Sequence, residues 1–297
     1  MEETQIPVRV SVLIVSCNCA EALRRCLEAL ERSAERETFE IIVVDNGSFD
    51  ESVAVIAGFP DVTPLHLPRN FGFTKALNIA MRTAKGEFFF FLSPRTEVLP
   101  ETIPALAARL AAEPGAVAVS PLLISPEGEP APRLYRLPNA ESAGAIARAS
   151  EFEAAAPPES DEEAIAVEFA DFTALMARAY FLKGLRYIDE RYAQSWADAE
   201  IAMQIRRSGK KMLLVPAVRA TLHPEDELRA SMPAAARALV AADWALGAAA
   251  FAGKHFGFAA GVKVRFATAL GALFSFQIKK FSYLLSGQRI DGTQNIM

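Results

Sequence analysis

The sequence has few cysteines, and their pattern excludes two common uses of that residue. Cys17, Cys19 and Cys26 are odd in number and lack the Cys-x-x-Cys spacing, which fits neither a disulfide framework nor a zinc site. We expect them to be reduced thiols of a cytoplasmic protein. The formal net charge of the 297 residues is −5 and the pI is about 5.5. This acidic balance argues against a nucleic-acid partner.

The chain also lacks an uncharged apolar run of about 18 residues, the length that a membrane-crossing helix requires. In the Ala- and Phe-rich C-terminal third, the apolar sequence is interrupted by Asp243, Lys254, Lys263 and Arg265. The acidic start, MEE at residues 1–3, does not have the form of a signal peptide. We therefore predict a protein that does not cross a membrane.

Charge is unevenly distributed along the chain. From Lys254 to the C-terminus there are six Lys or Arg against one acid, Asp291, so this segment carries +5 and the rest carries −10. Such asymmetry can mark a segment that faces a membrane or a partner. We expect either peripheral contact of the C-terminal helices with the inner face of a membrane or packing of these helices on the main domain. An apolar helix in this segment would also be compatible with a homodimer.

What the first half does contain is an alternation of apolar strands and amphipathic helices. A capping box, formed by Ser48 and Glu51, is predicted to open one of the helices. Alternation of this kind favours an α/β fold with a mostly parallel sheet flanked by helices. The expected strands are 8–16, 39–45, 62–67, 87–92 and 116–124. The other expected helices are 21–34, one that follows Arg69 to Gly72 and runs to about 84, and 100–112.

The second half is less regular. Residues 139–164 are rich in Ala, Glu, Ser and Pro and predict a mobile or partly helical insertion. Beyond it we expect a strand-like stretch at 167–178, a helix at 195–208, and two short strands at 211–215 and 218–222. The chain from about 232 to 285 is predicted to be helical. An approximate apolar stripe runs through Val264, Leu270, Phe274, Ile278 and Phe281 or Leu285.

Ligands of open α/β sheets bind outside the carboxyl ends of the strands. The polar segments that follow the predicted strands are Ser16-Cys17-Asn18, Asp45 to Ser48, Arg69-Asn70 and Ser93 to Thr96. These ends predict a pocket. The sequence has neither Gly-x-Gly-x-x-Gly after the first strand nor a P-loop, which argues against a dinucleotide-dependent dehydrogenase or an NTPase.

Several blocks of the sequence resemble the inverting family 2 glycosyltransferases of GT-A fold, with the rhamnosyltransferase-like branch as the most similar. They include IIVVDNGSFDES (41–52), RNFGFTKALNIAM (69–81), GEFFFFLSPRTEVLP (86–100) and the region 167–223. The resemblance implies a GT-A domain over 1–225, with a nucleotide-binding half at 1–120 and an acceptor and catalytic half at 121–225. Residues 226–297 would form a C-terminal helical extension. A nucleotidyltransferase is disfavoured because SCNCAEAL lacks the Gly-rich loop expected after the first strand.

The resemblance implies a UDP- or dTDP-linked sugar donor, a glycan or lipid-linked acceptor, and a set of donor-binding residues. Asp45 matches the acid that contacts the base and ribose, and a carboxylate can accept hydrogen bonds from an imide N–H or a hydroxyl. Ser16 and Asn18 match the first nucleotide loop, and Asn70 and Gly72 match a segment that borders the nucleotide. Alternatively, Asp45 closes a strand before an Asn-Gly turn, and Asn70 forms an Asx-turn.

Two further residues match the family's reaction centre. Asp198 aligns with the general base that takes the proton of the acceptor hydroxyl. Its helical spacing with Ile201, Ala202 and Ile205 would turn it inward, but Ser195 and Asp198 also fit a capping box. His223 aligns with a histidine near the metal or diphosphate, with a structural role at a strand end as the alternative.

One motif departs from the family. Where relatives have Asn-Pro-Asp, a DXD variant that holds Mn²⁺ or Mg²⁺, this chain has Ser93-Pro94-Arg95. A guanidinium repels a divalent cation, so we expect no metal cofactor. Arg95 would then replace the ion beside the diphosphate, or the protein is an inactive homologue that acts as a binding or regulatory partner. Ala197 and Gln204, at positions where relatives carry Glu and often Arg, favour the inactive alternative.

Overall fold

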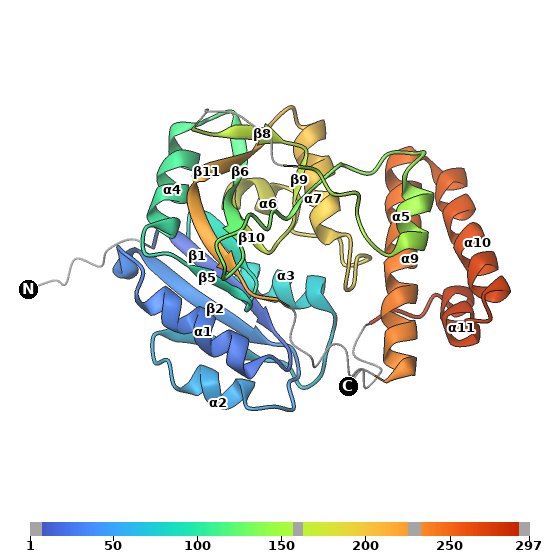
Figure 1. Cartoon of the computed structure of the whole chain (residues 1–297), viewed down its shortest axis with the longest axis horizontal. Helices are drawn as coiled ribbons and strands as arrows, with labels where there is room; N and C mark the ends of the chain where they lie inside the picture. Colours follow the sequence, from blue (N-terminus) through green and yellow to red (C-terminus); the bar gives the residue numbers. More distant parts are fainter. Residues whose placement is uncertain (1–7, 157–162, 225–232, 291–297) are drawn as a thin grey trace, which may run out of the picture.

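A computed structural model describes residues 8–156, 163–224 and 233–290 (Figure 1). The acidic start at 1–3, the predicted domain boundary at 225 and part of the 139–164 insertion lie outside these ranges. Within them, an α/β body carries the N-terminal and middle elements, and helices of the C-terminal segment pack along one side of it (Figure 1).

The body is built on a nine-stranded sheet in the order β3-β2-β1-β4-β10-β6-β11-β5, with β8 paired to β11. The strands β3, β2, β1 and β4 run parallel, whereas β10 is antiparallel to both β4 and β6. A separate pair, β7 and β9, is antiparallel. The strands are β1 (Val10–Ser16), β2 (Phe39–Asp45), β3 (Val62–His66), β4 (Phe88–Leu92), β5 (Thr96–Val98), β6 (Ala116–Ile124), β7 (Leu134–Tyr135), β8 (Ile165–Val167), β9 (Phe169–Ala170), β10 (Ala174–Arg178) and β11 (Lys211–Leu222).

Helices cover both faces of this sheet, as the alternating apolar sequence predicts. On β4, Phe88 and Phe90 pack with α1, α2 and α4, and Phe89 and Phe91 pack with α3, α6 and α7. Burial on both faces explains why this strand is apolar without alternation. The helices are α1 (Ala20–Glu31), α2 (Ser52–Ala57), α3 (Phe73–Thr83), α4 (Thr102–Ala112), α5 (Ala143–Ala149), α6 (Ala179–Gly184), α7 (Ala197–Arg207), α9 (Ala234–Phe256), α10 (Phe258–Phe274) and α11 (Ile278–Ser286), with a 3₁₀ turn at Arg36–Thr38.

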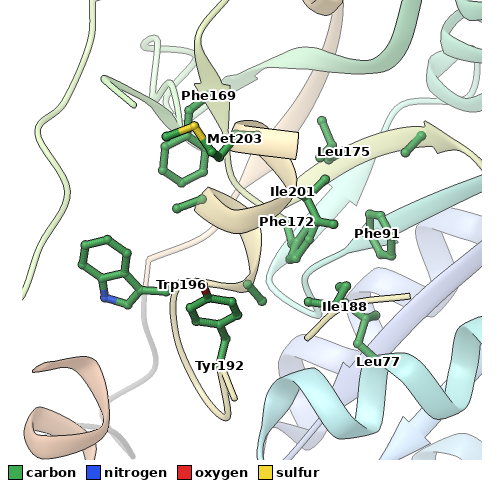
Figure 2. Close-up of a cluster of buried hydrophobic side chains, with 14 of the residues drawn as sticks. Leu77, Phe91, Phe169, Phe172, Leu175, Ile188, Tyr192, Trp196, Ile201 and Met203 are labelled. Atoms are coloured by element: carbon green, nitrogen blue, oxygen red, sulfur yellow. The ribbon is translucent and has the colours of Figure 1, made fainter. Parts of the chain in front are cut away.

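An aromatic core joins the sheet to α7 and to the C-terminal helices (Figure 2). The rings of Phe91 and Phe172 lie 4.6 Å apart between centroids, and those of Trp196 and Phe251 lie 5.3 Å apart. Because Phe251 belongs to α9, this contact attaches the helical extension to the turn that precedes α7. Truncating an aromatic side chain in such a core costs about 3–5 kcal/mol of unfolding free energy.

Some local predictions are wrong. The Ser48–Glu51 capping box does not form, because α2 begins at Ser52 and the Ser48 hydroxyl accepts a hydrogen bond from the Asn18 N–H instead. Residues 211–222 form one strand, β11, with a register shift between Val215 and Arg219, in place of two strands. The stretch 167–178 is divided among the end of β8, β9 and β10.

The predicted stripe through the C-terminal helices is also wrong. It is divided between α10 and α11, and Val264 is buried whereas Phe274, Ile278 and Leu285 are exposed. The insertion at 139–164 is partly helical, as expected, and its helix α5 packs against α9 and α10.

In the described part of the chain, α9 is the one helix long and apolar enough to cross a membrane. Half of its most apolar window is buried inside the protein, as in the core helix of a soluble protein, so length and composition alone are weak evidence. Asp243, in the middle of α9, is fully buried and accepts a hydrogen bond of 3.0 Å from the Gln194 N–H. This helix therefore packs on the α/β body.

Candidate functional site

The ends of β1 and β2 bring three predicted site residues together, Ser16, Asn18 and Asp45. Ser16 and Asp45 are register partners on the two parallel strands. Asn18 has a left-handed backbone with φ 49°, and its side-chain carbonyl accepts a hydrogen bond of 2.6 Å from Phe49 N–H. Its own N–H donates to Ser48 Oγ. The loops after the two strands thus hold each other in place, and the resulting edge is the one at which ligands of α/β sheets bind.

Asp45 combines burial with an unsatisfied acceptor. Its Oδ2 accepts a hydrogen bond of 3.3 Å from the Ser48 N–H, whereas Oδ1 is buried and has no hydrogen-bond partner among the described residues. A buried carboxylate oxygen without a donor is costly. A ligand N–H or O–H at this position would remove that cost, so Asp45 is suited to contact a nucleoside.

Asn70 and Gly72 border the same edge through Asn46. The Asn46 amide donates to Asn70 Oδ1 at 3.1 Å and to the Gly72 carbonyl at 3.3 Å. Asn70 Oδ1 also accepts from the Gly72 N–H at 2.9 Å, which is the Asx-turn that the sequence left open. Gly72 has φ 87°, and a Cβ there would lie 2.8 Å from the Ile290 carbonyl, so this position requires glycine.

A cavity of about 310 Å³ lies beside these ends, and residues of β1, β4 and the start of α7 contribute to its lining. Its apolar wall includes Leu77, Phe91 and Phe172, which Figure 2 shows in the core next to it. Its polar side is formed by Ser93, Arg133, Asp171, Thr173, Gln194 and Asp198. Two carboxylates and one guanidinium therefore lie among the polar residues of a cavity that also has an apolar wall.

Asp198 has the properties of a proton acceptor near neutral pH. Burial, followed by the negative charge of Asp171, raises its pKa to about 7. Its Oδ1 accepts one hydrogen bond of 2.8 Å, from the Ala199 N–H. The capping-box alternative does not form, because α7 has Trp196 as N-cap with no side-chain capping bond. Carboxylates with such pKa values suit general base catalysis.

Asp171 binds Arg133, the cation in the lining of this cavity. It accepts hydrogen bonds from Arg133 Nε at 2.9 Å, from the Tyr135 hydroxyl at 3.3 Å and from the Thr173 N–H at 3.0 Å. The Arg133 guanidinium also lies over the Tyr135 ring, 5.6 Å from its centroid. Arg133 is thus fixed through Nε and the ring, with its terminal NH₂ groups left for an anionic ligand.

Arg95 and His223 lie together, at the junction of β5 and β11. Arg95 Nη1 donates to the His223 carbonyl at 3.0 Å, and the His223 N–H donates to the Arg95 carbonyl at 2.9 Å. His223 Nε2 lies 2.7 Å from Glu97 Oε1. Ser93 and Pro94 line the cavity with Asp198, whereas Arg95 is not among its lining residues.

The residues at the junction of β5 and β11 do not form a site that suits a divalent metal. In the Ser93-Pro94-Arg95 loop, the Ser93 hydroxyl accepts from the Arg95 N–H, and the imidazole of His223 is directed to Glu97. Across the described ranges there is no group of three or more His, Cys, Asp or Glu side chains that could hold a metal ion.

The sequence analysis missed Arg133, Asp171 and Gln194. Asp171 had a detectable signal, since it is an acid enclosed by apolar residues in FADFTAL, and a buried acid needs a partner. Arg133 has no comparable signal, because its partner is 38 positions away. Of the three thiols, Cys17 and Cys19 are half-buried and Cys26 is buried, which agrees with the prediction of free cysteines.

The mixed sheet, the polar strand ends and the adjoining cavity define a GT-A type nucleotide-diphospho-sugar transferase fold. The chain belongs to the family described as Glycosyl transferase family 2, whose sequence profile matches residues 11–165. This assignment confirms the fold class and the family expected from the motifs.

Two curated relatives match part of the chain. An uncharacterized glycosyltransferase, YfnE, of Bacillus subtilis (strain 168) is 34% identical over 87 residues, which cover 28% of this chain and 22% of the relative. The undecaprenyl-phosphate 4-deoxy-4-formamido-L-arabinose transferase of Proteus mirabilis (strain HI4320) is 32% identical over 107 residues, or 34% of this chain and 33% of the relative. The matched region thus spans a third or less of either relative.

Two solved structures share the fold. GalNAc-T7, crystallised with UDP, GalNAc and Mn²⁺, superposes with a TM-score of 0.60 at 17% identity, covering 74% of this chain and 44% of that protein. TarS of S. aureus superposes with a TM-score of 0.54 at 18% identity, covering 79% of this chain and 39% of that protein. At these identities the likeness concerns the fold.

Proposed function

We propose that this protein transfers a sugar, with inversion, from a UDP- or dTDP-linked donor to a glycan or lipid-linked acceptor at the cytoplasmic face of the cell envelope. The observation that carries the proposal is the position of Asp198, a carboxylate with a pKa of about 7 in the cavity next to the donor-binding strand ends. Family membership supports the reaction class, and the two curated relatives are both transferases by description.

In the proposed reaction, Asp198 takes the proton of the acceptor hydroxyl while the acceptor oxygen attacks the anomeric carbon. The bond between that carbon and the diphosphate oxygen breaks, and the nucleoside diphosphate leaves with the bonding electron pair. Asp45 would receive a hydrogen bond from the base or ribose through its unsatisfied Oδ1, with Ser16, Asn18, Asn70 and Gly72 around it. A retained base in a formed cavity supports an enzyme over an inactive homologue.

We propose further that an arginine, and no metal, balances the charge of the leaving diphosphate. Arg95 is the candidate from the sequence, but its guanidinium already donates to the His223 carbonyl. Arg133 lines the cavity itself. A guanidinium can bind phosphate oxygens in a bidentate manner, so both residues are candidates. His223 would act in the diphosphate vicinity only by supporting Arg95.

Calorimetric titration tests this proposal. UDP and dTDP are titrated into the protein with and without Mn²⁺, then into Arg95→Ala and Arg133→Ala, with Arg24→Ala on the exposed face of α1 as control. We expect binding that does not depend on Mn²⁺ and that weakens about tenfold or more for either Arg95→Ala or Arg133→Ala. Strong enhancement by Mn²⁺ would contradict metal-free binding.

The transfer itself is tested with a panel of UDP-, dTDP- and GDP-sugars and measured as release of the nucleoside diphosphate. We expect release with at least one UDP- or dTDP-sugar and its loss in Asp198→Asn. No binding and no turnover with any donor would favour the inactive alternative.

A further inference from the structure

The C-terminal helices expose an unusual amount of apolar surface. Of the twelve large hydrophobic side chains that are exposed in the described ranges, eight lie between Phe258 and Leu285. Phe258 is 85% exposed and Phe276 is 86% exposed. A concentration of exposed apolar side chains in one segment is typical of an interaction surface.

Much of this surface is organised on one side of α10. Phe258, Val262, Phe266 and Leu273 are all exposed, and at 100° per residue they lie within about a quarter of the helix circumference. Phe274, Phe276 and Ile278 continue the exposed surface through the turn between α10 and α11. We call these seven residues the apolar face.

The charge around the apolar face has one sign. Residues 254–290 contain no Asp or Glu and six Lys or Arg, which are Lys254, Lys263, Arg265, Lys279, Lys280 and Arg289. A helical surface with aromatic side chains and only cations beside them is typical of segments that lie on anionic membranes. A protein partner would have to be acidic and apolar on the same surface.

A second cavity, of about 390 Å³, lies between α9 and α10 and adjoins the apolar face. Four cations line it, Arg191, Lys254, Arg265 and Arg289, and no carboxylate is among its lining residues. Phe258, Val262 and Arg265 belong both to this lining and to the exposed surface of α10. The cationic cavity and the exposed apolar residues are therefore continuous.

Three of the four cations have carboxylate neighbours. Arg191 Nη2 lies 2.7 Å from Asp189, Lys254 Nζ lies 2.8 Å from Glu200, and Arg289 Nη1 lies 3.6 Å from Asp243.

Arg265 differs, because its hydrogen-bond acceptors among the described residues are the carbonyls of Leu284 and Leu285, at 2.8 and 3.1 Å. Among the described residues its positive charge is thus not compensated by an acid. It is the natural counter-charge for an anion that enters the cavity.

We propose that the cavity between α9 and α10 binds the phosphate headgroup of an anionic membrane phospholipid, while the apolar face inserts its aromatic side chains among the lipid chains. Arg265 contacts the phosphate, and Phe258 and Phe266 lie on the acyl side. This site is separate from the donor cavity and adds a lipid surface to the partners of the protein. It would position the enzyme where lipid-linked acceptors reside.

The test is co-sedimentation of the full chain with vesicles of phosphatidylcholine alone or with about 30% phosphatidylglycerol, at low and high salt. We expect binding to the anionic vesicles only, decreasing with salt because charge drives the approach. Arg265→Glu and Phe266→Ser should each weaken vesicle binding by about tenfold or more. The matched controls are Arg24→Glu on α1 and Tyr180→Ser on α6, which change similar exposed side chains on the α/β body and should bind like the wild type.

Several outcomes would overturn the proposal. One is equal binding to both kinds of vesicle, or unchanged binding of Arg265→Glu. Another is a dimer in light scattering that Phe266→Ser dissociates without any vesicle binding, which would make the apolar face a self-association surface. Full competition by inorganic phosphate would assign the cavity to a free anion. UDP binding, measured for each variant, keeps this result separate from the donor site, since a folded variant should retain it.

Discussion

The two cavities of this protein differ in the sign and arrangement of their charges. The donor-side cavity has two carboxylates, Asp171 and Asp198, against a single arginine, whereas the cavity between α9 and α10 is lined by four cations and no acid. In the first, burial and then the negative charge of Asp171 raise the pKa of Asp198, which suits the proposed proton acceptor. In the second, Arg265 has no acid beside it among the described residues, which suits the proposed anion site.

The contrast separates the two proposed roles, sugar transfer at the first cavity and membrane attachment at the second. Asp198, the proposed proton acceptor, lies in the first turn of α7, a helix that also contributes Ile201 and Met203 to the core of Figure 2. The cationic cavity lies between helices that pack against one side of the α/β body. A buried charge cluster connects the α/β body with these helices. In it, Glu200 of α7 contacts Lys254 at 2.8 Å and His255 at 2.6 Å, both on α9.

The largest effect is expected at the proton acceptor. Asp198→Asn keeps the size of the side chain but removes the base, so turnover should fall by about 10²–10⁴-fold. UDP binding should change little, because Asp45 and its neighbours are untouched. Glu28→Gln, an exposed carboxylate on α1, is the control. Retention of more than a tenth of the wild-type rate would exclude Asp198 as the base.

Breaking the connection between the two regions should have the next largest effect. Glu200 is buried and its pKa is lowered to about 2, since hydrogen bonds from His255, Gln204 and Lys254 outweigh the opposing effect of burial. Glu200→Ala removes this acceptor from His255 and Gln204 and leaves Lys254 with Asp189 alone, so it should cost on the order of 2–4 kcal/mol of unfolding free energy. Urea denaturation measures it, with the half-exposed Glu190→Ala as control.

A smaller effect should follow from separating α9 and α10. A Cβ on Gly261 would lie 2.7 Å from the Ala249 carbonyl and 2.8 Å from Gly253 Cα, so Gly261→Ala should cost about 1–3 kcal/mol and weaken vesicle binding. Gly271→Ala, in the same helix but with no atom within 4 Å of the added Cβ, should stabilise by up to about 1 kcal/mol. Equal effects of the two substitutions would contradict close packing at Gly261.

The pH profile of kcat should shift when the charge next to Asp198 is removed. The base must be ionised, so kcat should rise as pH passes through about 7, the pKa of Asp198. Asp171→Asn removes the neighbouring negative charge and should move this midpoint lower. Glu153→Gln, an exposed carboxylate paired with Arg136, should leave the midpoint in place. An unchanged midpoint in Asp171→Asn would show that the charge of Asp171 does not affect the pKa of Asp198.

The free energy of unfolding should also depend on pH through Asp198, but it should fall as pH rises, whereas kcat should increase. The pKa of Asp198 is higher in the folded state than its usual 3.8, so between these values the folded protein binds more protons and unfolding free energy falls as pH rises. Asp198→Asn should therefore be more stable than the wild type at pH 8, by about 1–2 kcal/mol after allowance for its partial exposure. The difference should shrink towards pH 4, as thermal unfolding across pH would reveal.

Much of the fold could be predicted because it depends on local pattern. The runs 10–16, 39–45 and 88–92 are apolar on both faces and became central strands. The two predicted capping boxes do not form because Ser48 and Asp198 make tertiary contacts instead. Ser48 accepts a hydrogen bond from the Asn18 N–H, and Asp198 lines the cavity. The residues at the ends of β1 and β2 were found by topology alone, and their roles in binding remain predictions.

The α/β alternation, the family and the carboxylates Asp45 and Asp198 could be recognised from the order of the amino acids, since these depend on periodicity and on motif order. The folded molecule alone reveals that Arg133 lines the donor-side cavity while Arg95 is held by His223, and that Arg265 lines a cavity without an acid. The reason is physical: a side chain's charge is local in sequence, but its neighbours, and therefore its pKa and its available hydrogen bonds, are set by segments that meet only when the chain folds.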